Sequence, residues 1–245
     1  MRTLIAFLIS LLSAVDASAA CEKQAHSGNA YVVCRYDPQT ADVRFFLNDA
    51  AGAPYRHFNL VNNALARNDE KLVFAMNAGM YHKDRSPVGY YRENDRDIAA
   101  LNTNDGPGNF HLKPNGVFYV APDGRAFVEE TGTFLKIRQS PPKYATQSGP
   151  MLVIDDRIHP RFLPQSDSLK RRNGVGVTKT GEVFFVITDN PVRFYDFAVF
   201  FRDELKTPNA LYLDGTISRL YAPELGRNDP GAAMGPIVGV VAHLE

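Results

Sequence analysis

Short apolar runs rich in β-branched and aromatic residues recur along the whole sequence, and turn signals stand between them. Runs of this length and composition are typical of buried β-strands. Strands are therefore expected at residues 31–33, 43–47, 72–76, 89–91, 116–120, 126–128, 151–154, 174–177, 183–187, 210–213 and 237–241. Asp123-Gly124 and Thr180-Gly181 are turn dipeptides of the kind that hairpins require. A chain with this pattern has to fold around β-sheet.

Helical periodicity is rare in the sequence. Apolar side chains recur at steps of three and four residues between Phe194 and Leu205, which predicts a helix there. A second helix is expected from Asn62 to Asn68, and one helical turn from Asp167 to Lys170. No repeat or linker divides the 245 residues, a length that suits one large domain. We therefore predict an α+β fold: a single domain with a sheet-dominated, mixed β-sheet core and few flanking helices.

The first 20 residues have the pattern of an export signal. Arg2 supplies the positive end, residues 4–15 the apolar stretch, and Ala17-Ser18-Ala19 a small-residue cleavage site. An apolar stretch of this length cannot span a bilayer, which takes about 20 residues. We expect a signal peptide at residues 1–20 and a folded domain at 21–245, located in the periplasm or secreted, with no stable membrane insertion. Acylation of Cys21 as a lipoprotein is the alternative, although the usual Leu three residues before it is missing.

The sequence contains two cysteines, Cys21 and Cys34. In an oxidising compartment, a disulfide between them is the default expectation. Such a bond would tie the new N-terminus to the first strand, and nothing near either residue indicates nucleophilic chemistry.

The charge balance excludes some classes of partner. Lys and Arg total 27, and Asp and Glu also total 27. Nucleic-acid binders carry a basic surplus that neutralises phosphates, so no nucleic-acid partner is expected. A hydrophobic content of 44% with 22% charged residues also excludes disordered, collagen-like and coiled-coil classes.

Four segments place Gly, Asn or Asp at the end of an apolar run. They are Met76-Asn77-Ala78-Gly79-Met80-Tyr81, Gln147-Ser148-Gly149-Pro150, Arg172-Asn173-Gly174-Val175-Gly176 and Leu211-Tyr212-Leu213-Asp214-Gly215-Thr216-Ile217-Ser218. Each segment alone is most simply a turn. Together they are expected to meet at one rim of the sheet and form the main polar pocket, because such ends present donors and acceptors rather than packing well.

In this order, the four segments resemble the motifs of the phosphodiester glycosidase family, and the similarity covers roughly residues 30–242. Familiar forms of those motifs are Asn-Gly-Gly-Phe-Phe, Ser-Gly-Gly-Pro, Arg-Thr-Ala-Ile-Gly and Asn-Leu-Asp-Gly-Gly-Gly-Ser. The chain departs from them at Ala78, at Asn173-Gly174, at Tyr212 and at Thr216-Ile217. The resemblance implies an exported hydrolase of glycosyl phosphodiester or related glycosidic bonds in envelope or extracellular glycans. Its partner would be a carbohydrate or sugar-phosphate substrate.

The residue types suit this reaction. Hydrolysis of a sugar 1-phosphodiester expels a phosphate monoester, a far better leaving group than an alcohol, so help from a general acid matters less than in ordinary glycosidases. Asp214 is the first candidate to activate water or stabilise an oxocarbenium ion, and Asp189 is the second. Arg172 matches the family's arginine and offers a planar, charged fork for phosphate.

Further contacts to sugar or phosphate are expected from the polar turns. Candidate binding residues are Asn77, Gly79, Ser148, Gly149 and Ser218. Ser148 lacks the Gly-x-Ser-x-Gly nucleophile elbow, so it is interpreted as a contact or turn residue. His82 follows the first motif and is either an acid or base or an exposed loop residue. The remaining histidines, at positions 26, 57, 111, 159 and 243, show no metal-ligand spacing, so no metal and no cofactor are expected.

Two other classes stay open at this stage. A non-catalytic glycan- or phosphate-binding module of the same fold would keep the pocket without turnover. Tyr212 and the loss of the glycine run after Asp214 favour that alternative, since glycines allow a backbone to approach a ligand closely. An envelope scaffold protein would instead need an exposed apolar patch.

Overall fold

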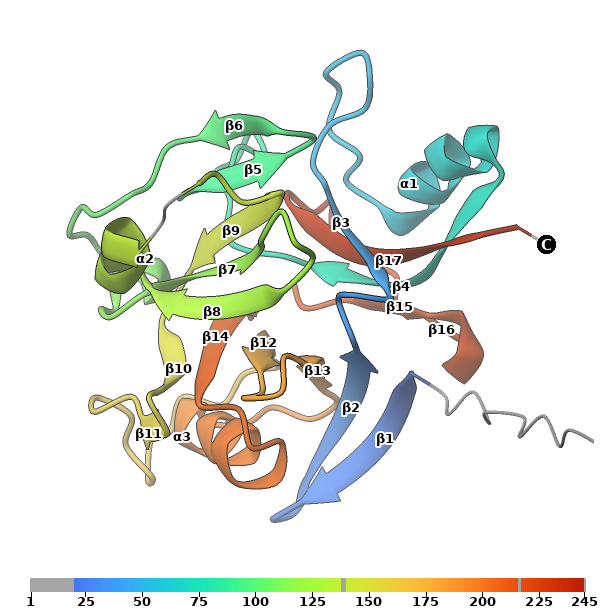
Figure 1. Cartoon of the computed structure of the whole chain (residues 1–245). Helices are drawn as coiled ribbons and strands as arrows, with labels where there is room; N and C mark the ends of the chain where they lie inside the picture. The colour runs from blue at the N-terminus through green and yellow to red at the C-terminus, as the bar shows by residue number, and fades with distance from the viewer. Residues whose placement is uncertain (1–19, 138–139, 216, 245) are drawn as a thin grey trace, which may run out of the picture.

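The expected strands form and pair into three sheets (Figure 1). The structure is a computed structural model that describes residues 20–137, 140–215 and 217–244. The proposed signal peptide lies outside the described residues. Within them, no helix has both the length and the apolar character needed to cross a membrane.

The largest sheet has seven strands. In spatial order these are β1 (Cys21–His26), β2 (Asn29–Tyr36), β13 (Val183–Thr188), β12 (Asn173–Val177), β14 (Asn209–Asp214), β10 (Met151–Ile154) and β11 (Arg157–Ile158). The π-extended helix α3 (Phe194–Val199, continuing through Phe200–Glu204) packs against this sheet through its aromatic side chains.

Two five-stranded sheets complete the fold. One has the order β16 (Arg227–Asn228), β15 (Leu220–Ala222), β4 (Glu70–Asn77), β17 (Ile237–His243) and β3 (Asp42–Phe46). The other has the order β6 (Arg96–Ala99), β5 (Tyr91–Glu93), β9 (Tyr144–Ser148), β7 (Gly116–Val120) and β8 (Ala126–Glu130). Helix α1 (Phe58–Leu65) packs against the first of these sheets and α2 (Thr131–Ile137) against the second.

The three sheets share one core of aromatic rings. Phe74 and Phe185, from different sheets, have ring centroids 4.9 Å apart, and Phe118 of the third sheet lies 5.6 Å from Phe185. Phe45 extends the cluster to Phe118 at 5.9 Å. All four side chains are buried. In a chain without Trp, these phenylalanines supply the large apolar areas that hold the sheets together.

The predicted α+β class with a sheet-dominated core and few helices is confirmed, with one difference in strand direction. The core was expected to be a mixed sheet, but the strand pairs of the described residues all run antiparallel. Tight turns such as the one between β1 and β2 join successive strands directly, and a two-residue turn reverses the chain.

The helices differ in detail from the sequence expectation. Helix α3 begins at Phe194 as predicted, whereas α1 begins at Phe58 because Phe58, Val61 and Leu65 form its buried face. No helix forms at residues 167–170, where Lys170 instead pairs with Val192 in an isolated bridge. Helix α2 was not predicted, since Gly132 interrupts its short apolar pattern.

The predicted disulfide between Cys21 and Cys34 is present. The two residues lie directly opposite each other in the β1–β2 pair, and both are buried. The bond therefore ties the edge strand β1, at the start of the folded domain, to β2 of the largest sheet. It also engages the thiol that the lipoprotein alternative requires free.

Candidate active site

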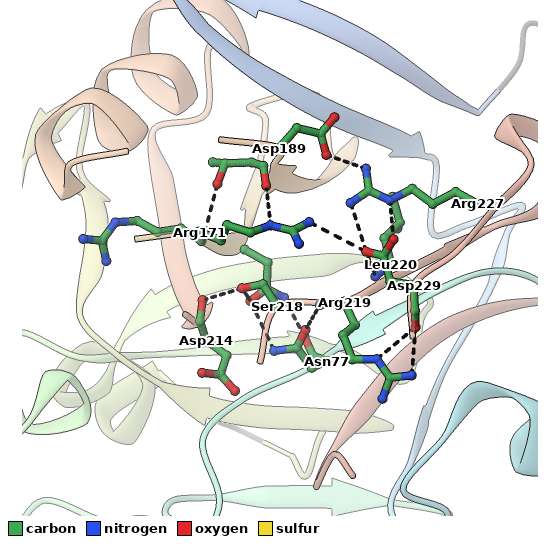
Figure 2. Close-up of polar contacts among 12 residues, drawn as sticks. Asn77, Arg171, Asp189, Asp214, Ser218, Arg219, Leu220, Arg227 and Asp229 are labelled. Carbon is green, nitrogen blue, oxygen red and sulfur yellow. Dashed lines mark hydrogen bonds and ion pairs between the residues drawn. The ribbon is translucent and has the colours of Figure 1, made fainter. Parts of the chain in front are cut away.

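A buried cluster of polar side chains joins the end of β4, the start of β12 and the turn after β14. Asn77 accepts a hydrogen bond from the Arg219 amide through Oδ1 (3.0 Å) and donates through Nδ2 to Asn173 Oδ1 (3.3 Å). Asn173 returns a bond to the backbone oxygen of Asn77 (2.8 Å). Ser218 Oγ lies 3.3 Å from Asn173 Oδ1 and donates to the backbone oxygen of Asp214 (3.1 Å) (Figure 2).

This cluster fixes the orientation of the Asn77 amide. Because its oxygen is occupied by the Arg219 amide, its nitrogen has to face Asn173 and Asp214. Figure 2 shows Asn77, Ser218 and Asp214 side by side. Segments that are far apart in the sequence thus converge on one carboxylate.

Asp214 is the carboxylate at the open end of the cluster. Its Oδ1 accepts a hydrogen bond from the Gly215 amide at 2.6 Å. Burial raises the pKa of Asp214 from 3.8 to about 6, and hydrogen bonds from Gly215 and from the Asn77 side chain oppose this rise. The residue is half-buried, and it lines a pocket.

Asp214 opens into a pocket of about 420 Å³. One wall carries Met80, Tyr81 and His82, which follow β4, together with Val88. The segment Pro107 to His111 forms a second wall, and Ile217 completes the lining together with Asp214. Among these lining residues Asp214 is the single carboxylate. The combination of a mostly apolar lining with one perturbed acid is typical of a small-ligand site.

Two glycines pack closely against the wall at residues 107–111. A Cβ at Gly89 would lie 2.6 Å from Phe110, and a Cβ at Gly149 would lie 2.8 Å from the Phe110 backbone oxygen. Asn115 adds a hydrogen bond from Nδ2 to that same oxygen (3.0 Å). Gly149 of the Ser-Gly-Pro motif therefore helps to position this wall of the pocket, because only glycine admits such close packing.

Two of the residues expected to form the site line the pocket, namely Asp214 and His82. The other expected site residues are not among the residues that line the pocket. Asn77, Ser148, Ser218 and Arg172 are buried. Ser148 Oγ donates to the backbone oxygen of Leu213 (3.0 Å), directly before Asp214. At Gly79 the backbone has a φ of +154°, and a Cβ there would lie 2.9 Å from Thr146 Oγ1.

Arg172 lies in the interior and not at the pocket surface. Its Nε donates to the backbone oxygen of Val192 (2.9 Å) and its Nη2 to that of Ser168 (3.1 Å). The guanidinium stacks 3.6 Å from the centroid of the Phe194 ring. Burial lowers the pKa of Arg172, and contact with Tyr212 opposes this effect. These contacts give Arg172 the role of a structural tie between the segment that precedes β12 and the segment that follows β13.

Asp189 is also placed away from the pocket lining. Its Oδ1 accepts a hydrogen bond from Arg227 at 2.7 Å, and Arg227 also binds Asp229 (Figure 2). Figure 2 shows Asp189 against Arg227, apart from Asp214. A carboxylate that is exposed and paired with an arginine favours a structural role.

The side chain of Tyr212 leaves room for only a glycine after Asp214. A Cβ at Gly215 would lie 2.3 Å from the Tyr212 hydroxyl, and this hydroxyl contacts Arg172 and Asn109. We expect Gly215→Ala to destabilise the fold by about 1–3 kcal/mol through overpacking. Adding Tyr212→Phe, which removes the clashing oxygen, should recover part of that loss. Urea unfolding measures the free energy of unfolding of the single and double variants. Strictly additive changes in this free energy would contradict the proposed clash.

Sequence reasoning missed the segment Pro107 to His111, which lines the pocket and contains Asn109 and His111. The available signal was the run Gly106-Pro107-Gly108, which marks a loop, although not which pocket it borders. The structure brings that loop over the end of β4, more than twenty residues earlier in the chain.

A larger pocket of about 560 Å³ lies elsewhere, between Tyr90, Ile98, Phe134 and Leu135. It contains none of the motif residues, and Asp97 is the one acid among its lining residues, already bound to Tyr90 and Arg92. Size alone therefore does not make it the better candidate for catalysis.

Comparison with known proteins finds a matching family model and a similar protein. The model of the family named phosphodiester glycosidase matches residues 70–241. The chain is 37% identical over 185 residues to the uncharacterized protein YigE of Escherichia coli K12, covering 76% of this chain and 71% of YigE.

Solved structures show the same fold at low sequence identity. The catalytic domain of zebrafish N-acetylglucosamine-1-phosphodiester alpha-N-acetylglucosaminidase, auto-inhibited by its pro-peptide, matches with a TM-score of 0.61 and 16% identity, covering 92% of this chain and 84% of that one. A Burkholderia pseudomallei protein provisionally described as exported matches with a TM-score of 0.59 and 11% identity, covering 86% and 74%.

Proposed function

Because this chain belongs to the phosphodiester glycosidase family, we propose that it is an exported hydrolase that cleaves the bond between a sugar and a phosphodiester in envelope or extracellular glycans. The observation that carries the proposal is Asp214, a carboxylate with a raised pKa, held by the Asn77 cluster at the open end of a pocket. The Asn77 and Asp214 motifs resemble the family's own.

Asp214 is proposed to act on the attacking water. Its carboxylate takes a proton from water and stabilises the positive charge that develops at the anomeric carbon. Asn77 is a positioning residue, because it is buried and contacts Asp214 instead of the pocket space. Ser148 and Ser218 support the backbone on either side of Asp214 in the same way.

A single carboxylate is compatible with this reaction. Ordinary glycosidases use a second carboxyl group to protonate the leaving alcohol. A phosphate monoester leaves readily, with a conjugate acid of pKa about 6, so that requirement is weaker. The position of Asp189, paired with Arg227 outside the pocket lining, is therefore consistent with the proposed substrate class.

Export is proposed on three grounds. The first 20 residues have the pattern of a signal peptide, the Cys21–Cys34 disulfide suits an oxidising compartment, and a structural neighbour is described as exported. The periplasm or the extracellular space is thus the proposed location.

The test is release of free sugar from diesters of N-acetylglucosamine 1-phosphate, with simple aryl glycosides as a second substrate class. Turnover of the phosphodiester supports the proposal. Binding of glycans without any turnover would instead support the alternative of a binding module of the same fold.

The pH dependence of turnover follows from the state of Asp214. Because water activation needs the ionised carboxylate, kcat/KM should rise with pH through about 6 and then level off on that limb. The measurement is kcat/KM for the phosphodiester from pH 4.5 to 7.5. An acid limb centred near the ordinary carboxyl value of 3.8 would contradict the assigned environment of Asp214.

A further inference from the structure

The pocket lining contains a histidine that the reaction as described does not use. His111 lines the pocket together with Asp214 and is half-buried. It lies at the end of a single 3₁₀ turn, Asn109–His111. Its neighbour Phe110 is buried against Gly89 and Gly149, so the backbone that carries the imidazole is anchored.

The ring of His111 is fixed on three sides. Nδ1 lies 3.0 Å from the backbone oxygen of Asn104. A Cβ at Gly106 would lie 2.7 Å from Cδ2 and 2.8 Å from Nε2, so the ring edge rests directly on the Gly106 backbone. The Phe110 ring meets the imidazole edge-on, with centroids 5.0 Å apart.

The contact with Asn104 determines which nitrogen carries a proton in the neutral ring. A backbone carbonyl oxygen can only accept a hydrogen bond, so Nδ1 has to be the donor. Nε2 is then the nitrogen whose proton is gained or lost. A base oriented by a third group through its other nitrogen is a recurring arrangement in catalytic sites.

We propose that His111 is the proton donor to the leaving group, acting from the segment Pro107 to His111 of the pocket lining while Asp214 acts on water. This inference rests on the proposed function and assigns the acid role that Asp189 does not occupy. Its basis is the pocket that His111 shares with Asp214, the fixed ring, and the contact with Asn104 that engages Nδ1 and leaves Nε2 as the nitrogen that exchanges a proton.

The proposed step is balanced in protons and electrons. The water oxygen bonds to the anomeric carbon while the bond from that carbon to the bridging oxygen breaks. The electron pair of the broken bond passes to the bridging oxygen, which takes the Nε2 proton of the His111 imidazolium. Asp214 receives one proton from the water. The site is reset when Asp214 releases this proton to solvent and His111 is protonated again.

Several charged groups lie near His111. Asp105 lies within electrostatic range and forms an ion pair with Lys113 at 2.7 Å. Asp214, His82 and Tyr81 line the same pocket.

The test uses His111→Asn in the full-length mature protein. Asn retains an amide donor at the position of Nδ1, and therefore the bond to Asn104, but it has no counterpart of Nε2. Because the phosphate monoester leaves readily, we expect kcat/KM for the phosphodiester to fall at pH 6.5 by less than the loss of about 100-fold expected for a phenyl glycoside, and the alkaline limb of the wild-type pH profile to disappear. The matched control is His243→Asn, an exposed residue at the far end of β17, which should leave both unchanged.

Leaving-group dependence provides a readout that a structural role would not change. Across phenyl, 4-nitrophenyl and 2,4-dinitrophenyl glycosides, the loss in His111→Asn should shrink as the phenol becomes more acidic, because an acidic phenol leaves without a proton. Thermal unfolding monitors the fold of each variant.

An alkaline limb that persists in folded His111→Asn, or an equal loss on all leaving groups, would overturn the role of His111. Where aryl glycosides are not turned over, the pH profile on the phosphodiester decides. Absence of any wild-type turnover would defeat the proposed function itself, whereas normal turnover in His111→Asn would defeat this inference alone.

Discussion

Asp214→Asn is expected to abolish hydrolysis of a sugar 1-phosphodiester while the protein remains folded. An amide cannot take a proton from water and carries no negative charge to stabilise an oxocarbenium ion. Turnover should therefore fall by a factor on the order of a hundred or more. The measurement is kcat for the phosphodiester, with circular dichroism as a check of folding.

The same substitution should not lower stability. Because the folded state holds the Asp214 proton more tightly than the unfolded chain, the ionised carboxyl opposes folding above pH 6, and this penalty is lost as pH falls below 3.8. The rise in pKa to about 6 corresponds to about 3 kcal/mol at most. Asp214→Asn should thus be as stable as the wild type or more stable at pH 7.5. Retained turnover in the folded variant would contradict the role of Asp214.

Asp189→Asn provides a contrasting variant. It removes a carboxylate of the same size, but one that is paired with Arg227 and lies outside the pocket lining. The account expects a small change in stability and a turnover close to that of the wild type. A loss as large as that of Asp214→Asn would restore Asp189 as the second catalytic carboxylate.

Arg172→Ala is expected to destabilise the protein by about 3–5 kcal/mol. The substitution removes the guanidinium that stacks on Phe194 and that donates hydrogen bonds to the backbone oxygens of Val192 and Ser168. A large buried side chain is also replaced by a cavity. The measurement is urea unfolding of the variant and the wild type at pH 7.

The substrate pattern of the Arg172 variant separates two interpretations. As a structural tie, Arg172 acts on the whole site, so kcat/KM should fall in parallel for phosphodiesters and for neutral aryl glycosides. Arg172→Lys, which keeps the charge but lacks the planar fork, should lie between alanine and the wild type in stability. A variant of normal stability that loses only phosphodiester turnover would show that Arg172 binds phosphate after all.

The fold was largely predictable because its signals are local. The strand at 183–187 is a continuous run of β-branched and aromatic residues, and it appears as β13 one residue longer. Antiparallel pairing and the absence of a helix at 167–170 were not predictable, because both depend on distant partners. Lys170, for example, pairs with Val192 in a β-bridge and not with its neighbours in a helix.

The candidate site was predictable in part. Asn77 and Asp214 meet as expected, because both end strands with a turn residue. Arg172 shows the limit of such reasoning, since its charge predicts exposure to a ligand while its ring stack and carbonyl contacts bury it. His111 shows the opposite limit, because its fixed ring depends on the carbonyl of Asn104 and the absent side chain of Gly106.

The most direct test of the central claim is the position of isotope after hydrolysis of an N-acetylglucosamine 1-phosphate diester in water enriched in oxygen-18. The sugar product is reduced immediately, so that its label is not lost by exchange, and both products are analysed by mass spectrometry. Attack of water on the anomeric carbon, as proposed for Asp214, places the heavy oxygen on the sugar and none on the phosphate monoester. Heavy oxygen on the phosphate would show cleavage at phosphorus and contradict the account.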